Sequence, residues 1–343
     1  MTHYINKSFG TMPDGEDIQF VMLKNANGME VQLMSYGATV TAIKVPLENQ
    51  SMVDVVLGFE NAASYIDSYN LPSPPYFGTI VGRYAGRINE STFELNGKTI
   101  QLNPNHGAHV LHGGEDGFSK KNWKIVNSKQ GINSAVTLSY TSPANEENFP
   151  GTLEVNVTYT LTESNELKVE YSATTSEDTI LNLTHHSYFN LDGHQEGITQ
   201  QELFVNAEKV IEKDHQNIPT GRVLPVAGTP FDFSTSKECP ISIDDTFVLS
   251  SSEEVAASLY SAKNNLQLLV YTNQPGVHIY VGGNCFDTIS GKEGANYHPL
   301  SGICFETQNF PDAPNHVEFP SAVLKKGEHY NHRTIYKFQS KSN

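Results

Sequence analysis

The chain of 343 residues contains little cysteine and tryptophan, and it has fewer basic than acidic side chains. Its 22 lysine and arginine residues face 38 aspartate and glutamate residues, which gives a formal net charge of −16. This charge disfavours nucleic acid and anionic membranes as partners, because neither would be attracted electrostatically. The three cysteines, Cys239, Cys285 and Cys304, are far apart, and no Cys-x-x-Cys pair occurs. Their pattern favours reduced, buried thiols in a cytoplasmic protein over a disulfide framework.

Several segment types are also absent from the sequence. No apolar run is long enough to cross a bilayer, and "MTHYINKSFG" at the start lacks the basic and apolar regions of a secretory signal. Cytoplasmic localisation is therefore the expectation. Neither G-x-x-x-x-G-K-[ST] nor H-E-x-x-H occurs. Without a linker, low-complexity tract or short repeat to divide it, residues 1–343 are predicted to form one domain.

Alternation of apolar and polar residues is the clearest pattern that the sequence does contain. It runs from Leu153 to Leu161 and resumes from Leu167 to Ala173 after a polar break, which predicts a hairpin with one buried face. "VQLMSYGATVTAIKVPL", "NLQLLVYT" and "GVHIYVGG" are further strand candidates between turn residues, and "NAASYIDSYN" is a candidate short helix. The prediction is an all-β protein, namely a large antiparallel β-sandwich or barrel-like domain.

Three histidines spaced three residues apart occur in "NPNHGAHVLHGGEDGF". On a strand, His109 would point away from His106 and His112, and the glycines argue against a helix, so a metal site is not expected. Gly113 and Gly114 follow His112 and leave the backbone bare, so that a ligand could approach closely. The alternative interpretation of this segment is an ordinary polar turn.

Two adjacent histidines end the apolar run of "LNLTHHSYFNLDG". Neighbouring strand residues point to opposite faces, so His185 and His186 cannot both serve one site as strand residues. In "GICFETQNF", Glu306 would share a strand face with Cys304 and Gln308. A carboxylate beside Phe and Cys is poorly solvated, which makes Glu306 a candidate general base; an exposed residue at a sheet edge is the alternative.

Two further segments carry polar side chains with open roles. Arg83 and Arg87 of "VGRYAGRINE" could donate to ligand oxygens or pair with acidic residues. In "YTNQPGVHIYVGGN", His278 and Tyr280 share one strand face, opposite three apolar residues. This polar face could line a cleft or be a solvent-exposed sheet surface.

Taken together, these segments resemble the aldose 1-epimerase, or galactose mutarotase, family. The similarity extends from about Phe9 to Phe338 through hallmark segments in the same order: "GRYAGRI", "LHGGEDGFSKKNW", "NLTHHSYFNLDG", "DDTFVL", "YTNQPGVHIYVGGN" and "GICFETQNFPDAPNHVEFPSAVL". The resemblance implies a single-domain β-sandwich of the galactose mutarotase-like supersandwich type. It also implies an isomerase that interconverts the α and β anomers of free hexoses such as D-galactose and D-glucose, without a metal or organic cofactor.

The resemblance also implies the two catalytic roles. The family's general base is the Glu of "ETQNFPDA", here Glu306, and its general acid is the His two residues before "YFNL", here His186. Mutarotation opens a hemiacetal by removing the proton on O1 while a proton is delivered to the ring oxygen. The reaction therefore needs one base and one acid on neighbouring oxygens, and a Glu and a His suit these roles.

The same resemblance implies a set of sugar-binding residues. The His of "HGG" is His112, the Arg that ends "GRxxxR" is Arg87, and the Asp that opens "DxTF" is Asp244 rather than Asp245. His278 stands where some relatives have Gln, so a sugar contact at His278 is left open.

Two departures from the family pattern and three rival functions remain at this point. His185 and Gly86 occupy positions where many relatives have Asn. A glycoside hydrolase would need a second carboxylate beside Glu306. A carbohydrate-binding module would bind sugar without catalysis, and a hexose-6-phosphate epimerase would need a basic phosphate pocket. The expected partner is a small monosaccharide, with monomer and homodimer both open.

Overall fold

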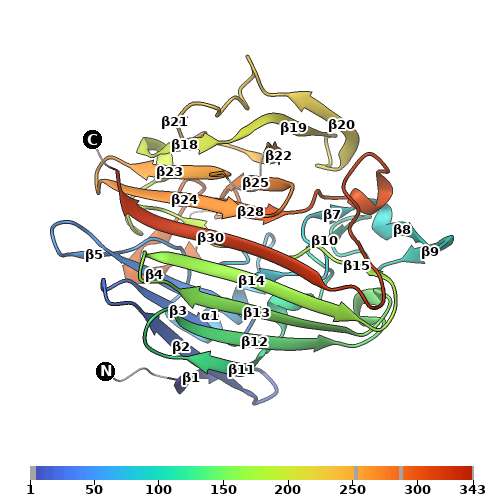
Figure 1. Cartoon of the computed structure of the whole chain (residues 1–343), viewed down its shortest axis with the longest axis horizontal. Helices are drawn as coiled ribbons and strands as arrows, with labels where there is room; N and C mark the ends of the chain where they lie inside the picture. The colour runs from blue at the N-terminus through green and yellow to red at the C-terminus, as the bar shows by residue number, and fades with distance from the viewer. Residues whose placement is uncertain (1–4, 251–253, 286–288, 342–343) are drawn as a thin grey trace.

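The computed structural model describes residues 5–250, 254–285 and 289–341, and Figure 1 shows their arrangement. Within these ranges, strands dominate, and all pairs of named strands run antiparallel. The predicted all-β class is therefore confirmed. The predicted hairpin is also confirmed, as β13 (Leu153–Leu161) and β14 (Glu166–Thr175). The candidate helix is α1 (Ala62–Asp67), where the Asn61 side chain caps the first turn by accepting from Ser64 N.

The largest sheet in the described ranges has nine strands and runs across the front of the view in Figure 1. In order across the sheet, the strands are β11 (Lys124–Lys129), β12 (Ser134–Ser142), β13, β14, β30 (Tyr330–Ser340), β24 (Leu266–Thr272), β23 (Ala257–Ser261), β18 (Glu202–Val205) and β21 (Lys237–Glu238). The C-terminal strand β30 pairs with both β14 and β24 and so joins the two halves of the sheet.

Two smaller sheets complete the main architecture of the described chain. One has the order β17 (Tyr188–Phe189), β28 (Ile303–Gln308), β25 (Gly276–Val281), β22 (Asp244–Leu249), β19 (Ala207–Lys213) and β20 (Pro219–Pro225). The other has the order β1 (Ile5–Thr11), β2 (Asp17–Lys24), β3 (Glu30–Met34), β4 (Val40–Pro46) and β5 (Met52–Asp54).

Short two-stranded ladders connect these sheets. They are β6 (Ile80–Val81) with β16 (Thr184–His185), β7 (Arg87–Ile88) with β10 (Val110–Leu111), β8 (Thr92–Leu95) with β9 (Lys98–Gln101), β15 (Thr179–Ile180) with β29 (Val323–Leu324), and β26 (Ile289–Ser290) with β27 (Asn296–Tyr297). No described helix has the length and apolar character required to span a bilayer.

One hydrophobic cluster packs the nine-stranded sheet against the two smaller sheets. Its members include Val157 of β13, Tyr336 of β30, Val31 of β3, and Ile279 and Phe305 of the six-stranded sheet. Because side chains alternate along a strand, the inward Ile279 and Phe305 leave their neighbours on β25 and β28 facing away from this core. The structure is thus a large antiparallel β-sandwich, and the outer face of its six-stranded sheet carries polar residues.

Candidate active site

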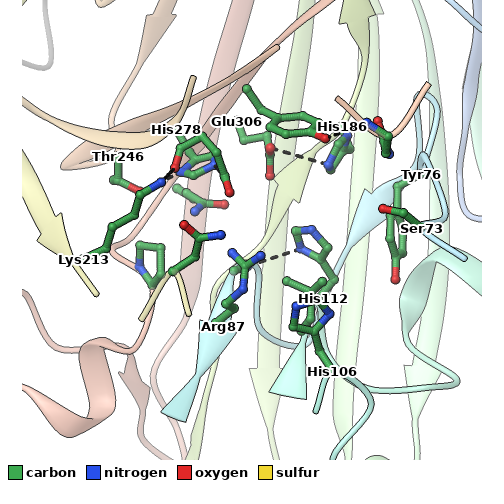
Figure 2. Close-up of a pocket in the computed structure, with 18 of the residues that line it drawn as sticks. Ser73, Tyr76, Arg87, His106, His112, His186, Lys213, Thr246, His278 and Glu306 are labelled. Atoms are coloured by element: carbon green, nitrogen blue, oxygen red, sulfur yellow. Dashed lines mark hydrogen bonds and ion pairs between the residues drawn. The ribbon is translucent and has the colours of Figure 1, made fainter. Parts of the chain in front are cut away.

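A pocket lies on the outer face of the six-stranded sheet, where the strand register places polar residues in rows. Thr246 is paired with His278, and His278 with Glu306, so these three residues from β22, β25 and β28 form one row. All three line the pocket, as Figure 2 shows. The register explains the grouping, since directly opposite residues on antiparallel strands present their side chains on the same face.

The pocket brings together every site residue that the sequence predicted. Loops and short ladders close it from the other side, and β7, the turn after β10 and the segment after β16 contribute Arg87, His112 and His186. The predicted residues that line the pocket are Arg87, His112, His186, Asp244, His278 and Glu306. They come from six separate segments of the chain.

Glu306 and His186 face each other in this pocket. His186 Nε2 lies 3.5 Å from Glu306 Oε1, and the residues are 4% and 2% exposed. Backbone hydrogen bonds hold His186 against a neighbouring segment: its N–H donates to Thr79 O, and its carbonyl accepts from Gly78 N. The ring also packs beside Tyr188 at a centroid distance of 5.2 Å. A carboxylate and an imidazole at this separation can act on two neighbouring oxygens of one ligand.

His185 points away from the pocket, which confirms that the two adjacent histidines have opposite directions. Its ring packs against Tyr159 and Tyr336 in the core, and Nε2 lies 3.1 Å from Ser187 Oγ. Burial, reinforced by the positive charge of His186, lowers the pKa of His185 to about 3. His185 is thus a neutral core residue at physiological pH.

His112 is held as a neutral hydrogen-bond donor. Its backbone has a positive φ of 54°, and its Nδ1 accepts from Gly86 N at 3.3 Å. Burial lowers the pKa of His112 well below its ordinary value, and the positive charges of His186 and Arg87 lower it further. A neutral imidazole that accepts at Nδ1 must carry its proton on Nε2.

This tautomer bears on metal binding at the site. Ligand atoms of His112, His186 and Glu306 lie within 4.8 Å of one another and could in principle surround an ion. However, a histidine coordinates metal through a nitrogen lone pair, and the hydrogen bond from Gly86 N places the proton of His112 on Nε2. The geometry therefore suits donation of an N–H to a ligand oxygen better than coordination of a metal.

Asp244 and His278 form a charged pair beside Glu306. His278 Nε2 lies 2.8 Å from Asp244 Oδ1, and Nδ1 lies 2.8 Å from Thr246 Oγ1. Burial disfavours the charge on His278, but the hydrogen bond with Asp244 and the charge of Glu306 outweigh it and raise the pKa of His278. Burial likewise opposes the charge on Asp244, but His278 and Lys213 hold its pKa well below the ordinary value. Asp244 therefore stays ionised at neutral pH.

The two arginines of "GRYAGR" have different surroundings. Arg87 lines the pocket, and its buried Nε has no hydrogen-bond partner among the described residues. Arg83 is 2% exposed and donates to Ser142 Oγ and to the carbonyls of Ser142, Pro143 and Pro150. Arg87 is therefore available to a ligand, whereas Arg83 ties a distant loop to the core.

The two glycines that follow His112 have a packing role that the sequence did not indicate. A Cβ on Gly113 would lie 2.1 Å from Gly82 O, and one on Gly114 would lie 2.4 Å from Glu147 Oε2. These glycines allow close packing within the chain, which is a sufficient reason for glycine at both positions. At Gly86, φ is +80° and a Cβ would lie 2.9 Å from Pro311 Cβ, which disfavours a side chain at this position.

Sequence reasoning missed several pocket residues. Lys213 contacts the Asp244 carbonyl and lies 3.2 Å from Asp245 Oδ1, while Tyr76 packs against His112. Thr246 and Gln308 also line the pocket. Strand alternation placed Gln308 on the face of Glu306 without assigning it to the site, and alternation from Asp244 would have indicated Thr246. No local pattern distinguishes Tyr76 or Lys213.

The chain is similar to known proteins over nearly its whole length. A profile of the aldose 1-epimerase family matches residues 19–337. Galactose mutarotase from Sus scrofa is 39% identical over 96% of this chain and 97% of its own length. Aldose 1-epimerase from Escherichia coli (strain K12) is 33% identical over 97% of this chain and 99% of its own length.

Solved structures show the same relationship. An aldose epimerase homologue from C. elegans superposes with a TM-score of 0.87 at 29% identity and covers 95% of this chain and 100% of its own. Galactose 1-epimerase from Lactobacillus acidophilus gives a TM-score of 0.86 at 26% identity, and the match covers 99% of this chain and 100% of that one. The fold is thus that of a mutarotase-like β-sandwich. The chain belongs to the aldose 1-epimerase family and is an isomerase.

Proposed function

We propose that this protein interconverts the α and β anomers of free hexoses such as D-galactose and D-glucose, with Glu306 as general base and His186 as general acid. The observation that carries the proposal is the 3.5 Å approach of His186 Nε2 to Glu306 Oε1 in a pocket that also contains Arg87, His112 and Asp244. The family relationship supports the reaction class, since the relatives are named galactose mutarotase and aldose 1-epimerase.

The reaction proceeds by two coupled proton transfers. The Glu306 carboxylate takes the proton from the anomeric O1, the C1–O1 double bond forms, and the bond from C1 to the ring oxygen breaks. His186 enters as an imidazolium and gives its Nε2 proton to the ring oxygen. Rotation about C1–C2 exposes the other face of the carbonyl, and closure with the roles reversed gives the other anomer. Glu306 and His186 then regain their starting states.

The other polar groups bind and orient the sugar. The Nε2–H of His112 and the guanidinium of Arg87 donate to sugar hydroxyl oxygens, and the ionised Asp244 accepts from hydroxyl groups. Both ring nitrogens of His278 already bond to Thr246 and Asp244. We therefore assign His278 the role of holding Asp244 rather than that of a direct sugar ligand.

Polarimetry on freshly dissolved α-D-glucose and α-D-galactose tests the proposal. The wild-type protein should accelerate the approach to the equilibrium rotation, whereas Glu306→Gln and His186→Asn should lose a factor on the order of 10²–10⁴ each. Glucose 6-phosphate and nitrophenyl glycosides separate the rival reactions. Preferred turnover of the phosphate, hydrolysis of the glycosides, or full activity of either variant would contradict the proposal.

A further inference from the structure

One strand, β28, contacts both nitrogens of the His186 imidazole. Glu306 Oε1 lies 3.5 Å from Nε2, and Cys304 Sγ lies 3.6 Å from Nδ1. Cys304 and Glu306 are two residues apart on β28 and share a face, so their Cα atoms are separated by about 6.6 Å along the strand. This spacing matches an imidazole ring placed between the two side chains.

The Cys304–His186 contact is buried and enclosed by packed side chains. Cys304 is 0% exposed, and it is paired in register with Tyr188, whose ring packs against His186. His112 packs edge-on against the His186 ring at a centroid distance of 5.4 Å. Within the described residues, the hydrogen-bond contact at His186 Nδ1 is the one to Cys304 Sγ.

The proposed reaction determines which atom must carry the proton in this contact. An imidazolium that gives up its Nε2 proton must keep the proton on Nδ1, since loss of both would leave an imidazolate anion. On ring closure, Nε2 must be unprotonated to accept the proton of the sugar hydroxyl. Nδ1–H is therefore needed in both states of His186, and its neighbour must act as an acceptor.

We propose that Cys304 is a positioning residue whose sulfur accepts the Nδ1–H of His186 and thereby reserves Nε2 for proton exchange with the sugar. This inference rests on the proposed role of His186 as the acid. It adds a residue to the machinery that no motif assigned, because a cysteine in an apolar strand resembles ordinary core packing.

The chemistry of a thiol suits this position. Burial, with the negative charge of Glu306, raises the pKa of Cys304 well above its ordinary value, so the group stays a neutral thiol. A carboxylate at the same place would stabilise the imidazolium and make its proton harder to give away. A neutral sulfur acceptor selects the tautomer without adding a second negative charge beside Glu306.

The test combines kinetics with the ¹⁵N NMR spectrum of labelled histidine. In the wild-type protein, neutral His186 should show the Nδ1–H tautomer. Cys304→Ser supplies a hydroxyl acceptor and should keep this tautomer and most of kcat. Cys304→Ala removes the acceptor and should give a mixture of tautomers, with kcat lower by about 10–100-fold, the range known for groups that orient metal-binding histidines.

Cys285→Ala is the matched control for lost packing. Cys285 is also a 0% exposed thiol in the same hydrophobic cluster, but its sulfur contacts Asn284 rather than His186. This variant should keep the wild-type tautomer and kcat, with melting temperature recorded for all variants. An Nε2–H tautomer in the wild-type protein, or wild-type tautomer and kcat in Cys304→Ala, would overturn the inference.

The tautomer is measured without turnover, so the two proposals can fail separately. If His186→Asn keeps full activity, the proposed acid is wrong whatever the spectrum shows. If His186→Asn is inactive while Cys304→Ala behaves as the wild type, only the role of Cys304 falls.

Discussion

His186 Nε2 and Glu306 Oε1 lie 3.5 Å apart, although the residues are 120 positions apart in the chain (306 − 186). His186 follows the short strand β16, whereas Glu306 lies within β28 of the six-stranded sheet. Their approach depends on the pairing of β17 with β28, which brings the segment after β16 alongside Cys304 and Glu306. The pair proposed to catalyse the reaction therefore forms only in the folded protein.

The double variant Glu306→Gln/His186→Asn tests whether the two residues act as a unit. Each single variant should lose a factor on the order of 10²–10⁴ in kcat, and the double variant should be no slower than the slower single one by more than about tenfold. The reason is that the proposed mechanism couples O1 deprotonation to ring-oxygen protonation. Polarimetry gives the rates. Losses that multiply fully would show independent roles.

The His185→Asn variant should keep its turnover, because His185 faces the core between Tyr159 and Tyr336. Any loss of kcat should stay well below the roughly 10²-fold loss expected when a general acid is removed. The measurement is kcat by polarimetry beside His186→Asn. A loss in His185→Asn as deep as in His186→Asn would mean that the acid had been assigned to the wrong histidine.

The free energy of unfolding should fall as the pH drops below 6.5. Burial lowers the pKa of both His185 and His332 from 6.5 to about 3. Between these values, each histidine binds a proton in the unfolded chain but not in the folded one, so acid favours unfolding. Each should cost about 2 kcal/mol between pH 6.5 and about pH 5.

Urea unfolding at the two pH values measures this dependence. In His332→Asn, the slope of the free energy of unfolding against pH should decrease by the contribution of one proton. Substitution of the exposed His215 by Asn should leave this slope unchanged. An unchanged slope in His332→Asn would show that His332 is protonated in the folded protein.

Two matched lysine substitutions should distinguish the structural role of Arg83 from the ligand-binding role proposed for Arg87. Arg83→Lys removes donors from the buried Ser142 and from the carbonyls of Pro143 and Pro150, and it should lower the free energy of unfolding by about 2–4 kcal/mol, with kcat retained. Arg87→Lys should raise KM for hexose and change stability by less than about 0.5 kcal/mol. Urea unfolding and initial rates give both quantities. The reverse pattern would contradict the assignment.

Asp244→Asn should weaken sugar binding and lower the pKa of His278. The loss of a charged hydrogen-bond acceptor costs about 1.5–3 kcal/mol, which corresponds to a rise in KM of roughly 10–100-fold. The neighbouring Asp245→Asn is the control, since Asp245 pairs with Lys213. An NMR titration of His278 and initial rates against galactose provide the readouts. Equal effects of both substitutions would refute the choice of Asp244.

Local patterns in the sequence predicted much of the fold and the members of the site. Alternation identified the β13–β14 hairpin and the shared direction of Cys304, Glu306 and Gln308, because side-chain direction along a strand depends only on position. The order of hallmark segments identified the family, and each residue that it indicated as a site residue lines the pocket.

The interpretation of individual residues was less reliable where it depended on unseen neighbours. The sequence left open whether Gly113 and Gly114 admit a ligand or form a polar turn, and in the structure they pack closely against Gly82 and Glu147. Residue type alone does not distinguish Arg83 from Arg87, yet one bonds to the loop around Ser142 and the other faces the pocket. Such differences depend on which distant backbone lies beside each residue.

The sequence by itself determined the β class, the family and the side of each strand that polar residues occupy, since these follow from short-range periodicity and residue identity. Only the tertiary structure decided that Cys304 and Glu306 flank the two nitrogens of His186, and that His278 bonds to Asp244 and Thr246. These pairings arise from strand register and sheet order. Both are fixed by packing between segments far apart in the chain, which no local pattern encodes.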